Sequence, residues 1–332
     1  MDTNQTQQLF FNHIKSKIPL HLSFVDEVAE LLNISNDSAY RRIRGEKSIG
    51  LDEMQLLCNK YHISLDQLLQ LQTNTYIFSG NFLDPHSFGL NQYLQFVANS
   101  LEFFKSLQSP HYYSYIKDIP LFNFMPFPEL CAFKFFFWKR SVIGYPELAR
   151  QRFTGVETDE ESIALAKKII DLFNQIPSTE IWIEESVTCT IRQIEFYRQS
   201  NIFVDDGIVL KVYEQLEELL NHMELQAEAG KKFLYNQHPM PNAASYDLYF
   251  NEYLLGDNMV YVQSAGRQIT FLNHNILNFM STQDTGFCDY TFKTLQNLIR
   301  KSTHISLVGE KERSMFFNGL RDKIHARMRL IK

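Results

Sequence analysis

The stretch Val25–Gly45, VDEVAELLNISNDSAYRRIRG, predicts two short helices that are joined by a tight turn. Apolar residues in 25–32 recur at the spacing of one helix face. Asn33 follows, and asparagine is one of the few residues that tolerate the left-handed conformation in which many helices end. Ile34 is expected to lie beneath the turn as an apolar anchor. Ser35 is a favourable N-cap for the second helix.

The second helix is expected to bury one narrow side and to expose a polar one. Ala39 and Ile43 lie four residues apart, so both are expected to face inward. Gly45 ends the helix. The other side chains of this helix are mostly polar or basic, and four of the positive charges in residues 1–72 lie within 41–47.

Three further helices are expected around this pair. Each has apolar residues at helical spacing, and Ser64 opens the last one with the pattern of a capping box. Their ranges are 4–17, 51–61 and 64–71. Residues 1–72 are therefore predicted to form a five-helix domain.

This arrangement resembles the helix-turn-helix DNA-binding domain of the Cro and phage-repressor family (the xenobiotic-response-element type), over about residues 8–71. Ala29 is the small residue where the two helices cross. Asn33 takes the turn position, where the family has a glycine, and Ile34 is its buried neighbour. Ala39 takes an inward position of the second helix, and Gly45 closes the motif. Arg42 departs from the pattern, because the family usually keeps its position apolar. Ile43 follows it, so the second helix could be rotated or one residue out of phase.

The resemblance implies that the second helix enters the major groove of DNA with its N-terminal residues on base edges. The candidate DNA-contacting residues are Ser35, Asn36, Asp37, Tyr40, Arg41, Arg42, Arg44, Lys47 and Ser48. Asn36 could form paired hydrogen bonds with adenine, and Arg41 or Arg44 with guanine. Lys47 and Ser48, in the loop after the helix, are natural phosphate contacts.

Three of these candidates have less definite roles. Tyr40 could pack on a thymine methyl group or bond a phosphate. Asp37 could accept a hydrogen bond from cytosine or orient Arg41. Arg42 is either a solvated residue at the edge of the motif or, in the interpretation that we favour, a phosphate contact.

The overall charge does not favour wholesale coating of nucleic acid. The 332-residue chain has a formal net charge of −6, and residues 1–72 contain seven Lys or Arg against nine Asp or Glu. Contact with phosphates depends on local clustering of positive charge, so DNA binding would depend on the basic cluster at 41–47.

The rest of the chain predicts a mainly α fold that ends in a small α+β portion. A linker is expected at 73–80, a helical bundle or array at 81–235, and an α+β portion at 236–332 that could form one domain with the preceding helices. The segment 179–199 has helical spacing of apolar residues. An antiparallel three-strand meander is expected from the segments 247–253, 259–263 and 268–272.

The segment Tyr112–Trp138 is dense in aromatic residues and could contain an extended piece before a helix. Two interpretations remain open. The segment could line the pocket of a small-molecule effector, because such pockets are mostly apolar. Alternatively, its aromatic residues could form an ordinary core or a dimer interface.

Motifs of enzymes and metal sites are missing from the sequence. It has no glycine-rich nucleotide fingerprint, no P-loop, no nucleophile elbow and no zinc-protease motif. Its four cysteines, Cys58, Cys131, Cys189 and Cys288, are scattered without zinc spacing. We therefore expect no catalytic residues, no metal and no cofactor. The N-terminus lacks the features of a secretion signal and no apolar run is long enough for a membrane span, so a cytoplasmic protein is expected.

These observations lead to one preferred function and two alternatives. The chain is expected to be a sequence-specific transcription regulator that binds double-stranded DNA. It is also expected to be a homodimer, because two-fold operators are matched by two-fold dimers. Residues beyond 72 would serve self-association and could bind an effector or a protein partner. The alternatives are a helical interaction scaffold with an accessory DNA-binding domain and a DNA-tethered enzyme with an unfamiliar site.

Overall fold

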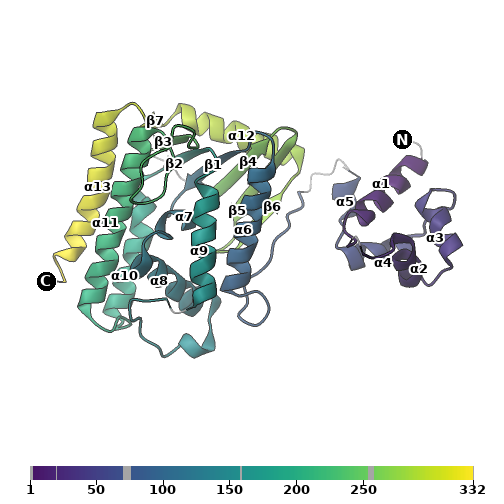
Figure 1. Cartoon of the computed structure of the whole chain (residues 1–332), viewed down its shortest axis with the longest axis horizontal. Coiled ribbons are helices and arrows are strands. Elements are labelled where there is room, and N and C mark those ends of the chain that lie inside the picture. Colours follow the sequence, from purple (N-terminus) through teal and green to yellow (C-terminus); the bar gives the residue numbers. More distant parts are fainter. Residues whose placement is uncertain (1–2, 20, 70–75, 158, 253–257, 332) are drawn as a thin grey trace. The chain divides into compact units, whose positions relative to one another are not determined.

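The computed structural model describes residues 3–19, 21–69, 76–157, 159–252 and 258–331. The chain forms two compact units, Met1–Ile77 and Phe78–Lys332, which are drawn in Figure 1. Each unit is considered by itself below. The first part of the predicted linker, 73–75, and the predicted end of the fifth helix, 70–71, lie outside the described residues.

The smaller unit is helical. Its elements are α1 (Thr3–Lys15), α2 (Phe24–Leu32), α3 (Asn36–Ile43), α4 (Leu51–Tyr61) and α5 (Leu65–Leu68). Its core is made of side chains that every helix from α1 to α4 contributes, including Phe11, Val28, Ala39 and Leu57, which are almost completely buried. Short helices of this kind are marginal alone, so packing on this shared core stabilises them.

The larger unit is built on one mixed sheet with the strand order β6-β5-β4-β1-β2-β3-β7. The strands are β1 (His111–Ile116), β2 (Ser178–Trp182), β3 (Tyr246–Phe250), β4 (Met259–Ser264), β5 (Arg267–Asn273), β6 (Phe279–Thr282) and β7 (Thr303–His304). The three adjacent strands β1, β2 and β3 run parallel, and every other neighbouring pair is antiparallel.

Helices cover the two faces of this sheet unequally. The crossover from β1 to β2 and the crossover from β2 to β3 are both helical. Their helices pack against the helix that precedes β1 and the helix that ends the unit, and together they form one large core. This layer contains α6 (Leu90–Ser106), α7 (Leu121–Phe124), α8 (Pro128–Phe137), a π-helix (Trp138–Ile143), a short 3-10 helix (Pro146–Leu148), α9 (Glu160–Phe173), a second 3-10 helix (Glu184–Val187), α10 (Thr188–Gln199), α11 (Asp206–Ala229) and α13 (Glu310–Met328). Figure 1 shows the long helices of this layer.

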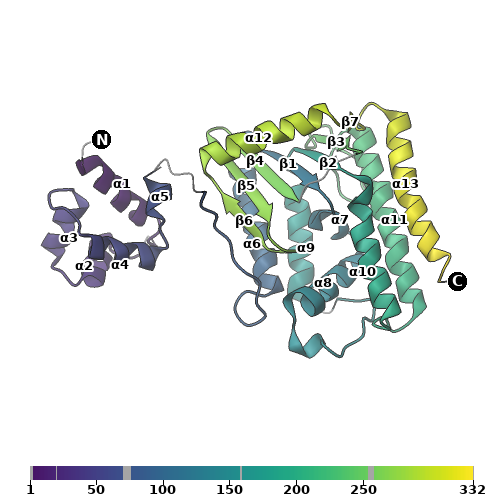
Figure 2. The same cartoon turned by 180° about the vertical axis from the view of Figure 1, so that it is seen from behind.

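The opposite face of the sheet is covered by α12 (Thr285–Arg300), which Figure 2 shows beside the strands. Side chains alternate between the two faces along each strand. In β1, Tyr112 joins the large core, whereas its neighbour Tyr113 packs on the α12 side. In β2, Trp182 joins the large core and Ile181 the α12 side. The central strands are therefore buried on both faces.

This sheet corrects two predictions. Residues 81–235 are not all-helical, because they supply the central strands β1 and β2, and the segment 179–199 begins as β2 rather than as a helix. Strands buried on both faces lack the alternation of polar and apolar residues that identifies half-exposed strands, so the sequence of β2 does not distinguish a strand from a helix. The three-strand meander is wrong at its first strand, because β3 pairs with β2 and β7, not with β4.

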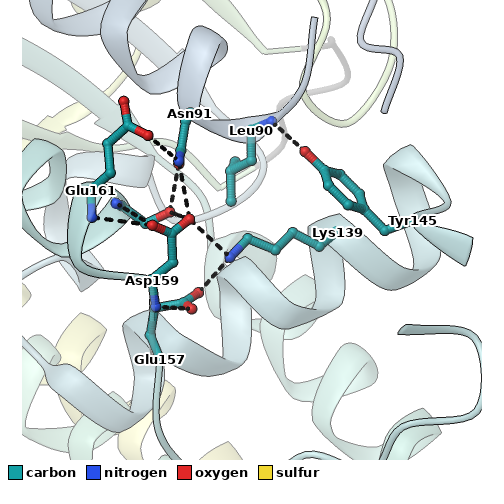
Figure 3. Close-up of polar contacts among 8 residues, drawn as sticks. Leu90, Asn91, Lys139, Tyr145, Glu157, Asp159 and Glu161 are labelled. Atoms are coloured by element: carbon teal, nitrogen blue, oxygen red, sulfur yellow. Dashed lines mark hydrogen bonds and ion pairs between the residues drawn. The ribbon is translucent and has the colours of Figure 1, made fainter. Parts of the chain in front are cut away.

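A polar network fixes the start of α6 against the start of α9 (Figure 3). The Asn91 amide donates to the carboxylates of Asp159, at 3.0 Å, and Glu161, at 2.7 Å. Lys139 belongs to the π-helix, and its Nζ lies 2.9 Å from a carboxylate oxygen of Glu157 and 3.8 Å from a carboxylate oxygen of Asp159. Three segments that are far apart in the sequence are thereby held together.

An acidic and a basic side chain are buried in the large core. Glu180 of β2 and Lys232, which follows α11, are 1% and 2% exposed. Glu180 accepts a hydrogen bond from the indole Nε1 of Trp182 at 3.0 Å, and Lys232 donates to the carbonyl oxygen of Phe173 at 3.1 Å. Burial raises the pKa of Glu180 and lowers the pKa of Lys232, and each charge opposes the shift of the other. The ionised form of each group is therefore favoured by the other group.

Candidate nucleic-acid interface

The turn between α2 and α3 has the conformation that its sequence predicts. Asn33 is left-handed, with φ 51° and ψ 50°, and its backbone N–H donates to the carbonyl of Glu30. Ser35 caps α3, since its hydroxyl accepts a hydrogen bond from the backbone N–H of Ser38 at 3.3 Å. The Asn36 amide donates to the Asp26 carboxylate of α2 at 2.8 Å. The start of α3 is thus fixed against α2.

The outer side of α3 and the following loop bring most of the predicted site together. All the predicted contacts except Arg42 are exposed: Ser35, Asn36, Asp37, Tyr40, Arg41, Arg44, Lys47 and Ser48. The guanidinium of Arg44 lies 5.2 Å from the centre of the Tyr40 ring and 3.8 Å from a carboxylate oxygen of Glu46. Positive charge on this side comes from Arg41, Arg44 and Lys47.

Arg42 is the exception, and its prediction as a phosphate contact is corrected. The residue is 6% exposed and faces the interior of the unit. Its guanidinium makes a two-point ion pair with Glu53 of α4, with Nε–Oε2 at 2.9 Å and Nη2–Oε1 at 2.6 Å. It also donates to the carbonyl of Ser38 at 3.2 Å. A side chain held in this way is not available to DNA.

The burial of Arg42 also settles how α3 is oriented. Ala39 and Arg42 are buried and Ile43 is half-buried, so the inward side follows the i, i+3, i+4 spacing of a regular helix. The inward side of α3 therefore includes a charged side chain, which Glu53 neutralises.

Glu53 links α3 to the start of α4. Besides its bonds to Arg42, its carboxylate accepts a hydrogen bond from the backbone N–H of Gly50 at 3.1 Å. The hydrogen bonds from Arg42 hold the pKa of Glu53 below its ordinary value. The ionised carboxylate is therefore favoured in the folded unit.

Acid is expected to loosen the α3–α4 contact. Because the pKa of Glu53 is lowered on folding, its contribution to stability is present above its ordinary pKa of 4.5 and is lost as the pH falls below that value. Amide hydrogen exchange in α3 and α4, corrected for intrinsic rates, should accelerate between about pH 6 and about pH 3. In Glu53→Gln the same amides should exchange faster at neutral pH and change less with acid. Equal pH dependence in both proteins would contradict this role.

The loop after α3 is held by two residues of α1 that belong to no recognisable motif. The Gln7 amide donates to the carbonyls of Arg42, at 2.6 Å, and Lys47, at 2.8 Å, and accepts from the backbone N–H of Ile49 at 3.1 Å. Gln8 donates to the carbonyl of Arg44 at 3.1 Å. Glutamines in a polar run carry no distinctive signal, so only the packing of α1 on α3 reveals them.

No protein-family model, no curated protein and no solved structure matches this chain. Its function must therefore be inferred from its own residues. Within the described ranges, no group of three or more His, Cys, Asp or Glu side chains is arranged to hold a metal ion. The four cysteines are unpaired by disulfides. Among the helices that the structure describes, none is both long and apolar enough to cross a bilayer.

Proposed function

We propose that this protein is a sequence-specific DNA-binding transcription regulator that reads the major groove with α3. The main support for this proposal is that α3 exposes a polar and basic side. Its opposite side is fixed by the buried residues Ala39 and Arg42 and by the hydrogen bond from Gln7 to the Arg42 carbonyl. A helix with its side chains is about 10–12 Å across, which matches the width of about 12 Å of the major groove. Rigid support matters because base contacts need fixed positions.

The roles of the exposed residues follow from their donors and acceptors. Asn36 uses one amide hydrogen on Asp26, and its second N–H and its carbonyl oxygen remain for the paired recognition of adenine. Arg41 is the natural reader of guanine, while Arg44, stacked beside Tyr40, could bond guanine or a phosphate. Asp37 would disfavour nearby phosphates and so restricts how α3 can dock.

DNA selection tests this proposal directly. The full chain would be incubated with random duplexes, and the bound fraction would be sequenced over several rounds. Enrichment of a defined motif, with two-fold symmetry if the protein binds as a homodimer, is the expected result. Recovery of unbiased sequences at every salt concentration would reject sequence-specific binding by this chain.

Lys47 is expected to contribute to affinity without contributing to sequence preference. Its loop is fixed through Gln7, and a lysine in such a loop neutralises one phosphate. Lys47→Ala should weaken binding to all duplexes alike and lower the slope of log K against log salt by about 1. Fluorescence anisotropy titrations at several salt concentrations would measure this slope. A changed sequence motif with an unchanged slope would place Lys47 on a base instead.

A further inference from the structure

Asp26 of α2 holds the side chain with which α3 begins. Asn36 is the first residue of α3, and its amide Nδ2 donates to the carboxylate oxygen Oδ1 of Asp26 at 2.8 Å. Hydrogen bonds that a carboxylate accepts are shorter and stronger than those between neutral groups. This bond therefore ties the first side chain of the helix that is proposed to read DNA to the neighbouring helix.

Both ends of this hydrogen bond rest on backbone that is itself fixed. The inward side chains Val28 and Ala29 of α2 are 0% and 5% exposed, and Ser35 caps α3 directly before Asn36. Only the side-chain rotations of Asn36 are left, and the bond to Asp26 restricts them. The side chains of Asp26 and Asn36 are exposed, so the remaining polar atoms of the amide can reach a ligand.

The hydrogen bond changes which bases the Asn36 amide can match. A free asparagine amide presents two N–H donors and one carbonyl acceptor. It can pair with adenine, which offers one donor and one acceptor in the major groove, or use both N–H groups on guanine, which offers two acceptors. Asp26 occupies one N–H. The donor and the acceptor that remain complement adenine but not the two acceptors of guanine.

We propose that Asp26 is a positioning residue that makes Asn36 select adenine over guanine at one base pair. The inference rests on the proposed function, because it assigns a base preference to a contact of α3 with DNA. Asp26 contacts no base itself, and its negative charge repels phosphates. It therefore contributes to sequence preference while it opposes affinity.

The test begins with the motif that the unaltered full chain selects from random duplexes. Asn36→Ala identifies the base pair that Asn36 reads, because preference should be lost at that pair alone. Fluorescence anisotropy then compares the selected duplex with one in which this A·T pair is replaced by G·C. The unaltered protein should prefer the A·T duplex by about 5-fold or more, as one paired contact allows.

Asp26→Ala should reduce this preference to about 2-fold or less, because both N–H groups of the Asn36 amide become available to guanine. Affinity for the selected duplex should stay within about 3-fold of its original value, since the loss of a negative charge favours binding to any duplex. A damaged fold would instead weaken binding to every sequence alike. Glu30→Ala removes another exposed carboxylate from α2 and is the matched control, which should keep the preference unchanged.

The possible failures are distinguishable. An unchanged preference in Asp26→Ala would overturn this inference and leave the proposed function standing. An unaltered motif in Asn36→Ala would do the same, since Asn36 would then read no base. In the Asn36→Ala background, Asp26→Ala should have no further effect at this base pair, and a further loss would show that Asp26 acts by another route. If the unaltered chain selects no motif, the inference and the proposed function fail together.

Discussion

Replacing Arg41 and Arg44 together with alanine is expected to weaken binding to the selected DNA motif at least 30-fold, since each base-reading arginine contributes about 1–3 kcal/mol. Both guanidinium groups are exposed on the outer side of α3. Their loss should therefore remove contacts with DNA, to a base at Arg41 and to a base or a phosphate at Arg44, without disturbing the core of Met1–Ile77. Anisotropy titrations at one fixed salt concentration would measure the change.

Lys60→Ala is the matched control for this double variant. Lys60 is an exposed positive charge of the same unit, but it lies near the end of α4 rather than on α3. The control should bind the motif nearly as the unaltered protein does, apart from a small uniform loss from reduced charge. If the double variant keeps both the affinity and the sequence preference, α3 does not read DNA with these residues and the proposed function fails in this form.

Breaking the buried charge pair of the larger unit is expected to have the largest effect on stability. Glu180→Gln leaves the Lys232 ammonium group without its counter-charge in a site where it is 2% exposed. Removal of one partner of a buried pair typically lowers the free energy of unfolding by about 3–5 kcal/mol. Both tryptophans, Trp138 and Trp182, lie in this unit, so fluorescence-detected urea unfolding follows it selectively.

The double variant Glu180→Gln/Lys232→Met supplies the decisive comparison. It removes both charges, so much of the loss should be recovered if the two groups are coupled. Glu228→Gln changes an exposed glutamate of α11 and should shift the free energy of unfolding by less than about 0.5 kcal/mol. A Glu180→Gln protein as stable as the unaltered one would show that Glu180 carries no charge that Lys232 needs.

The smaller unit was largely predictable because its signals are local. The left-handed turn at Asn33, the cap at Ser35 and the inward side of Ala39 each depend on residues within a few positions of one another. Arg42 was not predictable in this way. Its partner Glu53 lies eleven residues away, and only the packing of α4 against α3 brings the two together. Gln7 was not predictable for the same reason, because it hydrogen-bonds to a loop about forty residues further along the chain.

In the larger unit, the sequence predicts the long helices but not the sheet that they cover. Helical spacing alone indicated α6, α9, α11 and α13, since each buries one side and exposes the other. For β1 the sequence indicates only an extended piece before a helix within Tyr112–Trp138, and β2 carries no strand signal. Residues 178–182 are all buried, and they include Glu180, whose carboxyl group accepts hydrogen bonds from Trp182 and Ser178 and is also stabilised by Lys232.

The amino-acid sequence by itself thus determined the helix, turn and helix of Val25–Gly45 and the exposed basic side of α3, which are set by short-range spacing and capping. Only the tertiary structure decided that Arg42 belongs to the interior and that β1 and β2 lie at the centre of one sheet. Those features depend on contacts between residues far apart in the chain. No local pattern encodes such contacts, because burial and charge neutralisation exist only after the elements have packed.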